Sequence, residues 1–181
     1  MQEKNSKKYI HTQHKIFKDP KSNVDFHWFK GSSNKHNHNY YEIIVICDGC
    51  FTHEYKGTIT NLSKGDVVLI TPEYYHFLKA TQPTSIHANF SISKSEFINF
   101  TKKINESSFN FLNETSGLVY KLNNSQLDCL TSMLNEIQNS PTASNGGLNY
   151  YFLSIIHWLF GIIIIQSQNT VSTKIYPKWL S

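Results

Sequence analysis

The chain has 181 residues, and we expect one domain with a sizeable core followed by a short helical appendage. An apolar content of 39% with 17% charged residues excludes a disordered chain, and an aromatic content of 14% is enough to line a ligand cavity as well as a core. The net charge of +4 comes with lysines and no arginine, the residue best suited to reading guanine, so the chain by itself is a poor DNA reader.

The expected compartment is the cytoplasm. Three cysteines, an odd number, argue against a disulfide framework and for a reducing environment. The stretch from Met1 to Ser22 is polar and lacks the apolar run of a secretory signal. The apolar run from Tyr151 to Ile165 is shorter than the ~20 residues that cross a bilayer, so we expect a buried helix and no membrane partner.

From Val24 to Ile92 the sequence divides into short runs rich in β-branched and aromatic residues, a pattern typical of a sandwich or barrel. Asp48-Gly49, Lys56-Gly57 and Lys64-Gly65 supply the glycines that tight hairpins need. We therefore expect adjacent antiparallel strands. The candidate strands are Phe26–Phe29, Tyr40–Cys47, Phe51–Tyr55, Thr58–Thr60, Val67–Thr71, His76–Ala80 and Ser85–Ser91.

A cluster of imidazoles and one carboxylate stands out between the first strands. In an extended strand, residues two apart point the same way, so we expect His36, His38 and Glu42 to share one face. His76, at the start of a later strand, is positioned to join them. Imidazoles with a carboxylate suit either a divalent metal or a polar ligand, so this face predicts a cavity with a binding site.

The final strand also carries alternating polar residues. Ser85, His87 and Asn89 lie two apart, so if one of them faces the cavity all three do. The alternative is that His87 is a core histidine on the opposite face, with its ring nitrogens satisfied there.

Helical signals begin where the strands end. Ser93-Lys-Ser-Glu96 reads as a capping box, in which the serine and the glutamate satisfy free amides at a helix start. The stretch around Asn105 to Gly117 reads as a loop.

Two further helices are expected. The first opens at Ser125-x-x-Asp128, and Pro141 closes it; the second runs from Leu148 to about Gln168. The apolar stripe of the second helix is wider than a simple coiled-coil seam, so we expect it to pack on the barrel and on a partner subunit at once. The apolar seam of the first helix is Leu127, Leu130, Leu134 and Ile137.

The motifs together resemble those of a known family. The matching stretches are His36-Asn-His38-Asn-Tyr-Tyr-Glu42-Ile-Ile, Gly49, Gly65-Asp66-Val-Val-Leu-Ile-Thr-Pro72 and Tyr75-His76-Phe77. They are similar to the two cupin motifs of the N-terminal sensor domains of AraC/XylS-type transcriptional regulators. The resemblance implies a mainly β domain with C-terminal helices (α+β): a cupin or jelly-roll double-stranded β-helix followed by an antiparallel helix pair.

The resemblance also implies a division of the chain. An N-terminal arm would span 1–23, the cupin-like sensor barrel 24–92, a helical dimerisation and packing region 93–172, and the start of a linker 173–181. The last five residues, from Pro177, are similar to the stretch that leads into the family's helix-turn-helix region. We therefore expect the sensor half of a longer bacterial regulator, the alternative being a stand-alone cupin.

By the same resemblance the protein is not an enzyme. Its barrel would bind a small polar, carbohydrate-like effector, its C-terminal helices would form a homodimer, and DNA would be contacted only through a C-terminal domain absent from this chain. Phe17 in the arm is a candidate apolar plug over the ligand, the alternative being a disordered tail. The expected ligand-binding residues are His36, His38, Glu42, His76, Ser85, His87 and Asn89.

A metal is the alternative occupant. The resemblance extends to metal-dependent cupin enzymes, which hold iron, manganese, zinc or nickel through residues at the spacing of His36, His38, Glu42 and His76. The second motif departs from the enzyme pattern, with Glu73 where a glycine is usual and Ala80 where an asparagine is usual. We therefore expect no resident cofactor, and keep a divalent metal in a cupin isomerase or dioxygenase as the competing hypothesis.

Overall fold

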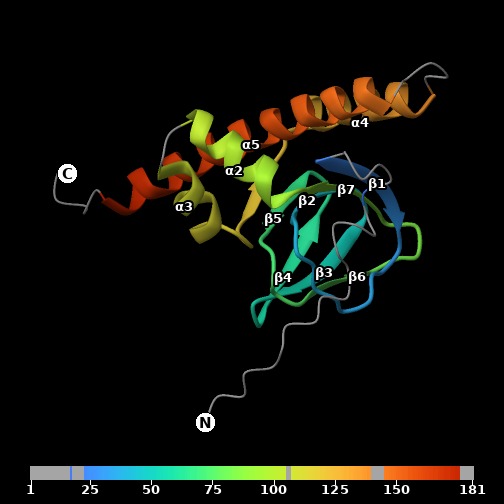
Figure 1. Cartoon of the computed structure of the whole chain (residues 1–181). Helices are drawn as coiled ribbons and strands as arrows, with labels where there is room; N and C mark the ends of the chain where they lie inside the picture. The colour runs from blue at the N-terminus through green and yellow to red at the C-terminus, as the bar shows by residue number, and fades with distance from the viewer. Residues whose placement is uncertain (1–16, 18–22, 105–106, 140–144, 176–181) are drawn as a thin grey trace, which may run out of the picture.

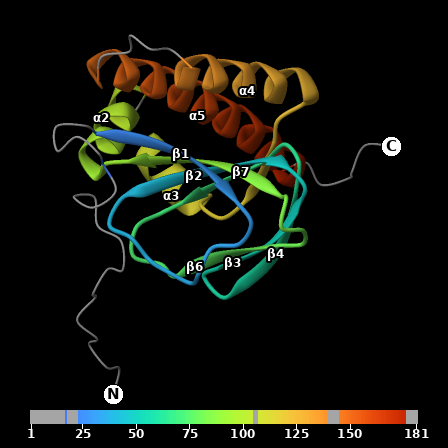
Figure 2. The same cartoon turned by 90° about the vertical axis from the view of Figure 1, so that its right-hand side faces the viewer.

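The computed structural model describes Phe17 and residues 23–104, 107–139 and 145–175. Two antiparallel sheets face each other, and a layer of helices covers the outer side of the larger sheet (Figures 1 and 2). In order across the larger sheet lie β1 (Val24–Lys30), β7 (Ile86–Ile92), β2 (Tyr41–Asp48), β5 (Asp66–Ile70) and β8 (Val119–Lys121). In order across the smaller sheet lie β4 (Thr58–Ser63), β3 (Cys50–Tyr55) and β6 (His76–Ala80).

The helices are α2 (Lys94–Ile104), α3 (Ser107–Glu114), α4 (Asn124–Asn139) and α5 (Asn145–Ile175). In Figure 2, α4 and α5 run in opposite directions across the top of the larger sheet. The predicted mainly β domain with C-terminal helices is confirmed, and each of the seven predicted strands has a counterpart among β1 to β7.

The larger sheet is buried on both faces, which explains why β2 reads as a continuous apolar run. Ile43 and Val45 point toward the helices and belong to one hydrophobic cluster. Ile44 and Ile46 point toward the smaller sheet and belong to another, with Phe51, Leu62 and Leu78. Because side chains alternate along a strand, even-numbered positions of β2 face the interior of the sandwich.

The helical layer is attached through aromatic contacts. Ser93 accepts a hydrogen bond from the backbone amide of Glu96 at 3.1 Å, so the predicted cap at the start of α2 is confirmed. One turn later Phe97 stacks on Tyr41 of β2, with ring centroids 3.6 Å apart, and packs edge-on against Phe160 of α5 at 5.4 Å. Phe97 is therefore the point at which the sheet, α2 and α5 meet.

Three details of the C-terminal half were predicted wrongly. The expected loop around Asn105 to Gly117 contains α3, whose Leu112 is fully buried. The short strand β8 was not expected, and it adds to the larger sheet a strand from beyond residue 92. Helix α4 is capped by Asn123 and Gln126, whose side chains each accept a hydrogen bond from the other's backbone amide at 2.9 Å. This capping box lies two residues before the expected one of Ser125 and Asp128.

Helix α5 is longer than expected. It extends over 31 residues, and its segment Asn149–Ser167 has the length and composition of a membrane span, with a mean hydropathy of 1.6. The expectation that the apolar run around Tyr151 to Ile165 is too short to cross a bilayer is therefore wrong. Its buried positions include Ile155, Leu159 and Phe160, which belong to the hydrophobic cluster beneath the helices, so α5 serves as a core helix of this domain.

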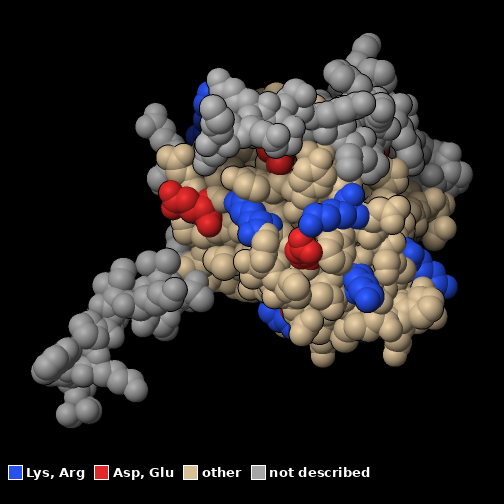
Figure 3. All heavy atoms as spheres, turned by 90° about the horizontal axis from the view of Figure 1, so that it is seen from below, with Lys and Arg blue, Asp and Glu red and all other residues tan. Residues whose placement is uncertain are grey.

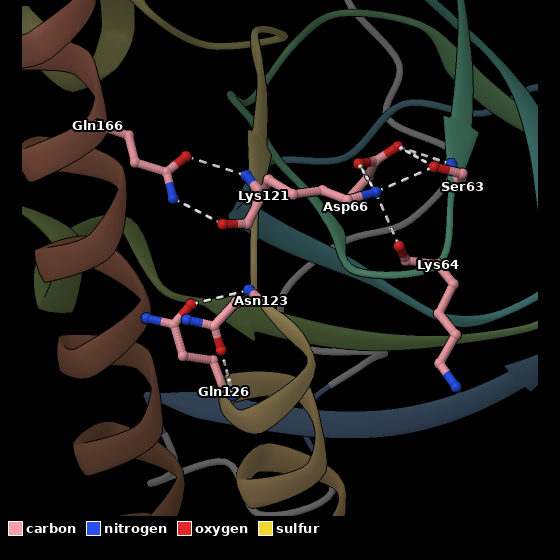
Figure 4. Close-up of polar contacts among 7 residues, drawn as sticks. All are labelled: Ser63, Lys64, Asp66, Lys121, Asn123, Gln126 and Gln166. Atoms are coloured by element: carbon pink, nitrogen blue, oxygen red, sulfur yellow. Dashed lines mark hydrogen bonds and ion pairs between the residues drawn. The ribbon is translucent and has the colours of Figure 1, made fainter.

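Side-chain hydrogen bonds join α5 to the edge of the sheet (Figure 4). The amide of Gln166 accepts from the backbone N–H of Lys121 at 3.0 Å and donates to its carbonyl at 2.6 Å, as a neighbouring strand would. The Lys121 ammonium reaches Asp66 at 2.8 Å and Ser63 at 3.0 Å. Strand β8 is thereby held between β5 and the helix, which covers an otherwise unpaired sheet edge.

The contacts of Phe97 predict its contribution to stability. Phe97→Ala should lower the free energy of unfolding by about 3 to 5 kcal/mol, because the ring is fully buried between Tyr41 and Phe160. The neighbouring Ile98 is 36% exposed, so Ile98→Ala should cost less than about 1 kcal/mol. Urea denaturation of both variants measures the difference, and equal losses would contradict this account of the helical layer.

Candidate functional site

Three separate segments bring the predicted cluster together. Glu42 lies on β2, and His76 begins β6. His36 forms an isolated antiparallel bridge with His76, in which each backbone amide donates to the other's carbonyl, at 3.0 Å from His36 and 2.9 Å from His76. His36 and His38 precede β2, which begins at Tyr41, so the alternation of an extended strand does not set their directions; their side chains nevertheless converge with that of Glu42, as expected.

The cluster is compact and buried. The ligating atoms of His36, Glu42 and His76 all lie within 4.8 Å of one another. Oε2 of Glu42 lies 3.4 Å from Nε2 of His76 and 3.6 Å from Nε2 of His38. The side chains of Glu42, His38 and His76 are at most 2% exposed, so water hydrates none of them freely.

Neighbouring carbonyls fix two of the ring tautomers. Nδ1 of His36 lies 2.7 Å from the carbonyl of Asn34, and Nδ1 of His38 lies 2.7 Å from that of Tyr40. A carbonyl only accepts, so in both rings Nδ1 carries a proton. Within the described residues, Oε2 of Glu42, Nε2 of His38 and both ring nitrogens of His76 have no hydrogen-bond partner.

The charges of the cluster follow from its burial. Burial alone would raise the pKa of Glu42, but the imidazoles of His76 and His38 outweigh it and hold that pKa below its usual range. Burial lowers the pKa of His76 to about 3. Both shifts favour an ionised carboxylate beside a neutral imidazole of His76 at neutral pH, which is the protonation state that metal ligands require.

The cluster forms part of the wall of a cavity of about 290 Å³ between the two sheets. From β7, His87 and Asn89 face this cavity, and the amide of Asn89 donates to Oε1 of Glu42 at 2.5 Å. Of the two interpretations of His87, the structure supports the cavity-facing one. The lining residues are His27, Phe29, Ser33, Asn34, His36, Tyr40, Glu42, Ile44, His76, Leu78, His87, Asn89 and Ser91.

Two predicted ligand-binding residues lie off this wall. Ser85 precedes β7, and its hydroxyl donates to the carbonyl of Cys50 at 3.4 Å, so it supports a hairpin and does not line the cavity. The expected alternation fails there because the regular strand starts only at Ile86. His38 lies behind the wall, in contact with Glu42.

Some residues that line the cavity were not predicted from the sequence. Phe29 of β1 is paired in register with His87 and stacks on it, with ring centroids 5.3 Å apart. His27, two residues earlier, lines the same cavity, and the alternation of β1 was the available signal. His53 of β3 does not line the cavity but lies beside the cluster, with its ring centroid 5.9 Å from that of His76, and burial lowers its pKa to about 4.

Phe17 lies close to the cavity wall. Its side chain is 5% exposed, and its ring centroid is 6.0 Å from that of Tyr40, which lines the cavity. Phe17 is not among the residues that line the cavity, so its role as a plug stays a prediction. The remainder of the predicted arm, 1–16 and 18–22, lies outside the described residues.

The sequence matches the family described as AraC-like ligand binding domain over residues 29–139. No curated protein matches it.

Solved structures similar to this chain include oxalate decarboxylase of Bacillus subtilis, at 17% identity and a TM-score of 0.37 over 41% of this chain and 22% of that chain. The chain thus spans about a fifth of the length of oxalate decarboxylase. A Cupin 2 conserved barrel domain protein from Salinispora arenicola is 21% identical, with a TM-score of 0.38 over 49% of this chain and 80% of that one. An HTH_3 family transcriptional regulator from Vibrio cholerae is 13% identical, with a TM-score of 0.33 over 39% and 43%.

The burial of His87 predicts a dependence of stability on pH. Burial lowers the pKa of His87 from 6.5 to about 4, so between these values the unfolded chain binds a proton that the folded chain does not. Stability should therefore fall as the pH decreases from 6.5 toward 4. His87→Gln should make this decrease shallower, whereas Ser91→Ala, a change on the same strand and the same wall, should not.

Urea denaturation of the three proteins at intervals between pH 7 and pH 4 measures the slopes. An unchanged slope in His87→Gln would contradict the buried, neutral state of this imidazole.

Proposed function

The chain belongs to the AraC-like ligand-binding domain family, and we propose that it is the effector-sensing and dimerisation domain of a bacterial transcriptional regulator. The observation that carries this proposal is the cavity of about 290 Å³, because buried polar atoms without partners converge on it from β2, β6 and β7. Buried polar groups are nearly always hydrogen-bonded in folded proteins, so such a wall calls for a polar occupant.

The larger sheet offers a route from the cavity to the helices. Glu42 lines the cavity, and the preceding residue, Tyr41, stacks on Phe97 of α2 on the opposite face. On β1, His27 lines the cavity while Phe26 packs on Phe152 of α5 at 5.4 Å. A ligand that prefers one position of these strands would thereby favour one position of the helical layer.

The proposed partners follow from the surface. Helix α5 exposes Tyr150, Tyr151 and Ile165, which are 73%, 60% and 62% accessible, and these side chains support a homodimer through the C-terminal helices. Figure 3, a view from below, has separate lysine and acidic side chains on a mostly uncharged surface. DNA would be contacted through a further domain, and a cytoplasmic location suits that role.

A ligand screen tests the sensing role. Sugars and other small polar metabolites that enter the cavity should raise Tm. At a ligand concentration of roughly 100 times Kd, binding adds about 2.7 kcal/mol to the free energy of unfolding. Ser91→Leu places a larger side chain on the cavity wall and should weaken such binding at least tenfold. Ser132→Leu, the same change on the exposed side of α4, should bind as the wild type does.

Thermal-shift and calorimetric titrations of the three proteins give the result. Failure of every metabolite to stabilise a protein that unfolds cooperatively, or equal binding by Ser91→Leu, would contradict a sensor with its effector in the barrel.

A divalent cation is the second candidate occupant, and with it a metal-dependent cupin enzyme of the isomerase or dioxygenase type. The specific observation is that ligating atoms of His36, Glu42 and His76 gather within 4.8 Å, with His38 beside them. Imidazole and carboxylate donors fit manganese, iron, nickel or zinc. A bound ion would supply Lewis acidity, while Asn89 holds Glu42 in place through its hydrogen bond to Oε1.

Metal analysis tests this second candidate. Protein loaded with manganese, iron, nickel or zinc and then desalted should retain about one ion per chain, and His76→Ala should lose it because it removes a central donor. His27→Ala removes another cavity histidine, one outside the cluster, and should keep the ion. Elemental analysis showing no retained ion in the wild type would remove the metal and enzyme candidates and leave the sensor proposal intact.

A further inference from the structure

The cavity wall is rich in hydrogen-bond acceptors. Oε2 of Glu42 accepts only, and no described residue donates to it. The amide nitrogen of Asn89 is engaged with Oε1 of Glu42, so its Oδ1 is directed elsewhere as an acceptor, again with no partner among the described residues. Two buried acceptors without a partner in the described chain, one of them on a carboxylate, therefore belong to residues that line the cavity.

Among the buried wall atoms without a partner in the described chain, only imidazole nitrogens can donate a hydrogen bond. Nδ1 of His87 and both ring nitrogens of His76 are buried without a partner in the described chain, and a neutral imidazole donates through only one nitrogen. No lysine is among the described residues that line the cavity, whereas one carboxylate is. An entering carboxylate or phosphate, which only accepts, would face the lone pairs and the charge of Glu42 after losing its own hydration.

An ammonium group has the complementary chemistry. It brings one positive charge and three N–H donors, and no acceptor. The charge would compensate the buried carboxylate, since a buried ion without a counter-ion is costly. Tyr40 and Phe29 on the same wall are aromatic, and the faces of such rings attract cations. Ser91, Asn34 and Ser33 add hydroxyl and amide groups that suit further polar groups on the ligand.

We propose that the cavity takes a small organic cation, a compound carrying an ammonium group together with hydroxyl groups, and discriminates against anions. This inference rests on the proposed sensing function and narrows its effector from small polar compounds to donor-rich, positively charged ones. The cavity of about 290 Å³ restricts the ligand to the size of a monosaccharide or smaller.

Two matched series of probes test the proposal on protein dialysed against EDTA. The first is 2-aminoethanol, ethylene glycol and glycolate; the second is glucosamine, glucose and glucuronate. In at least one series the amine should bind at least tenfold more tightly than the acid, with the neutral alcohol between them. Calorimetry gives Kd, and thermal shift gives an independent readout.

Two variants locate the preference. Asn89→Leu removes one acceptor from the wall and should weaken amine binding at least tenfold, whereas Asn61→Leu, the same change at an exposed position of β4, should leave it unchanged. Glu42→Gln replaces an acceptor with a donor and should abolish the preference for the amine over the acid. Should Glu42→Gln fail to fold, Asn89→Leu still decides the outcome.

The outcomes separate this inference from the proposed function. Equal or tighter binding of the acids or neutral alcohols, lost in Ser91→Leu, overturns the inference and leaves a sensor of another effector class. If the acids bind only after manganese is added, a metal ion and not an organic cation balances the charge of Glu42, and this result also overturns the inference. No binding by either series or by the metabolite panel overturns both.

Discussion

The carboxylate of Glu42 is buried in the interior of the sandwich, and the site is organised around it. Asn89 donates to one of its oxygens, while His38 and His76 lie 3.6 and 3.4 Å from the other. An ionised group at such a position is costly unless hydrogen bonds and charges compensate it. Asn89 pairs with one oxygen and the nearby imidazoles lower the pKa of the carboxyl group, but no described residue donates a hydrogen bond to the other oxygen, and Glu42 lines the cavity. A ligand that donates to this oxygen would satisfy it.

The larger sheet connects the buried carboxylate of Glu42 to the helices. Its strands are buried on both faces, so consecutive residues serve different partners: Glu42 the cavity and Tyr41 the helix α2. At the far edge, Gln166 of α5 hydrogen-bonds to both backbone groups of Lys121 as a neighbouring strand would. The helical layer is therefore attached to the sheet both by aromatic contacts and by hydrogen bonds, and it covers the face opposite the cavity.

Sequence patterns predicted the strands and much of the site because local rules govern them. The alternation around Ile43 and Ile44 and the glycines of the hairpins suffice for β1 to β7, and Ser93 caps α2 as expected. Strand β8 was missed because its three residues pair only in the presence of β5 and α5. Ser85 was misplaced because alternation holds only inside a regular strand. His53 was overlooked, since only folding brings β3 beside β6 and His76.

NMR of the histidine ring nitrogens, before and after addition of a ligand that raises Tm, tests directly whether the ligand binds in the barrel. Long-range ¹H–¹⁵N spectra report the tautomer and contacts of each imidazole. The carbonyl of Tyr40 should keep a proton on Nδ1 of His38 in the free protein. A ligand in the cavity should shift the ring signals of His76 and His87, which line it. His157, exposed on α5 and stacked on Phe100, should not shift. Shifts at His157 with none at His76 or His87 would contradict a ligand site in the barrel.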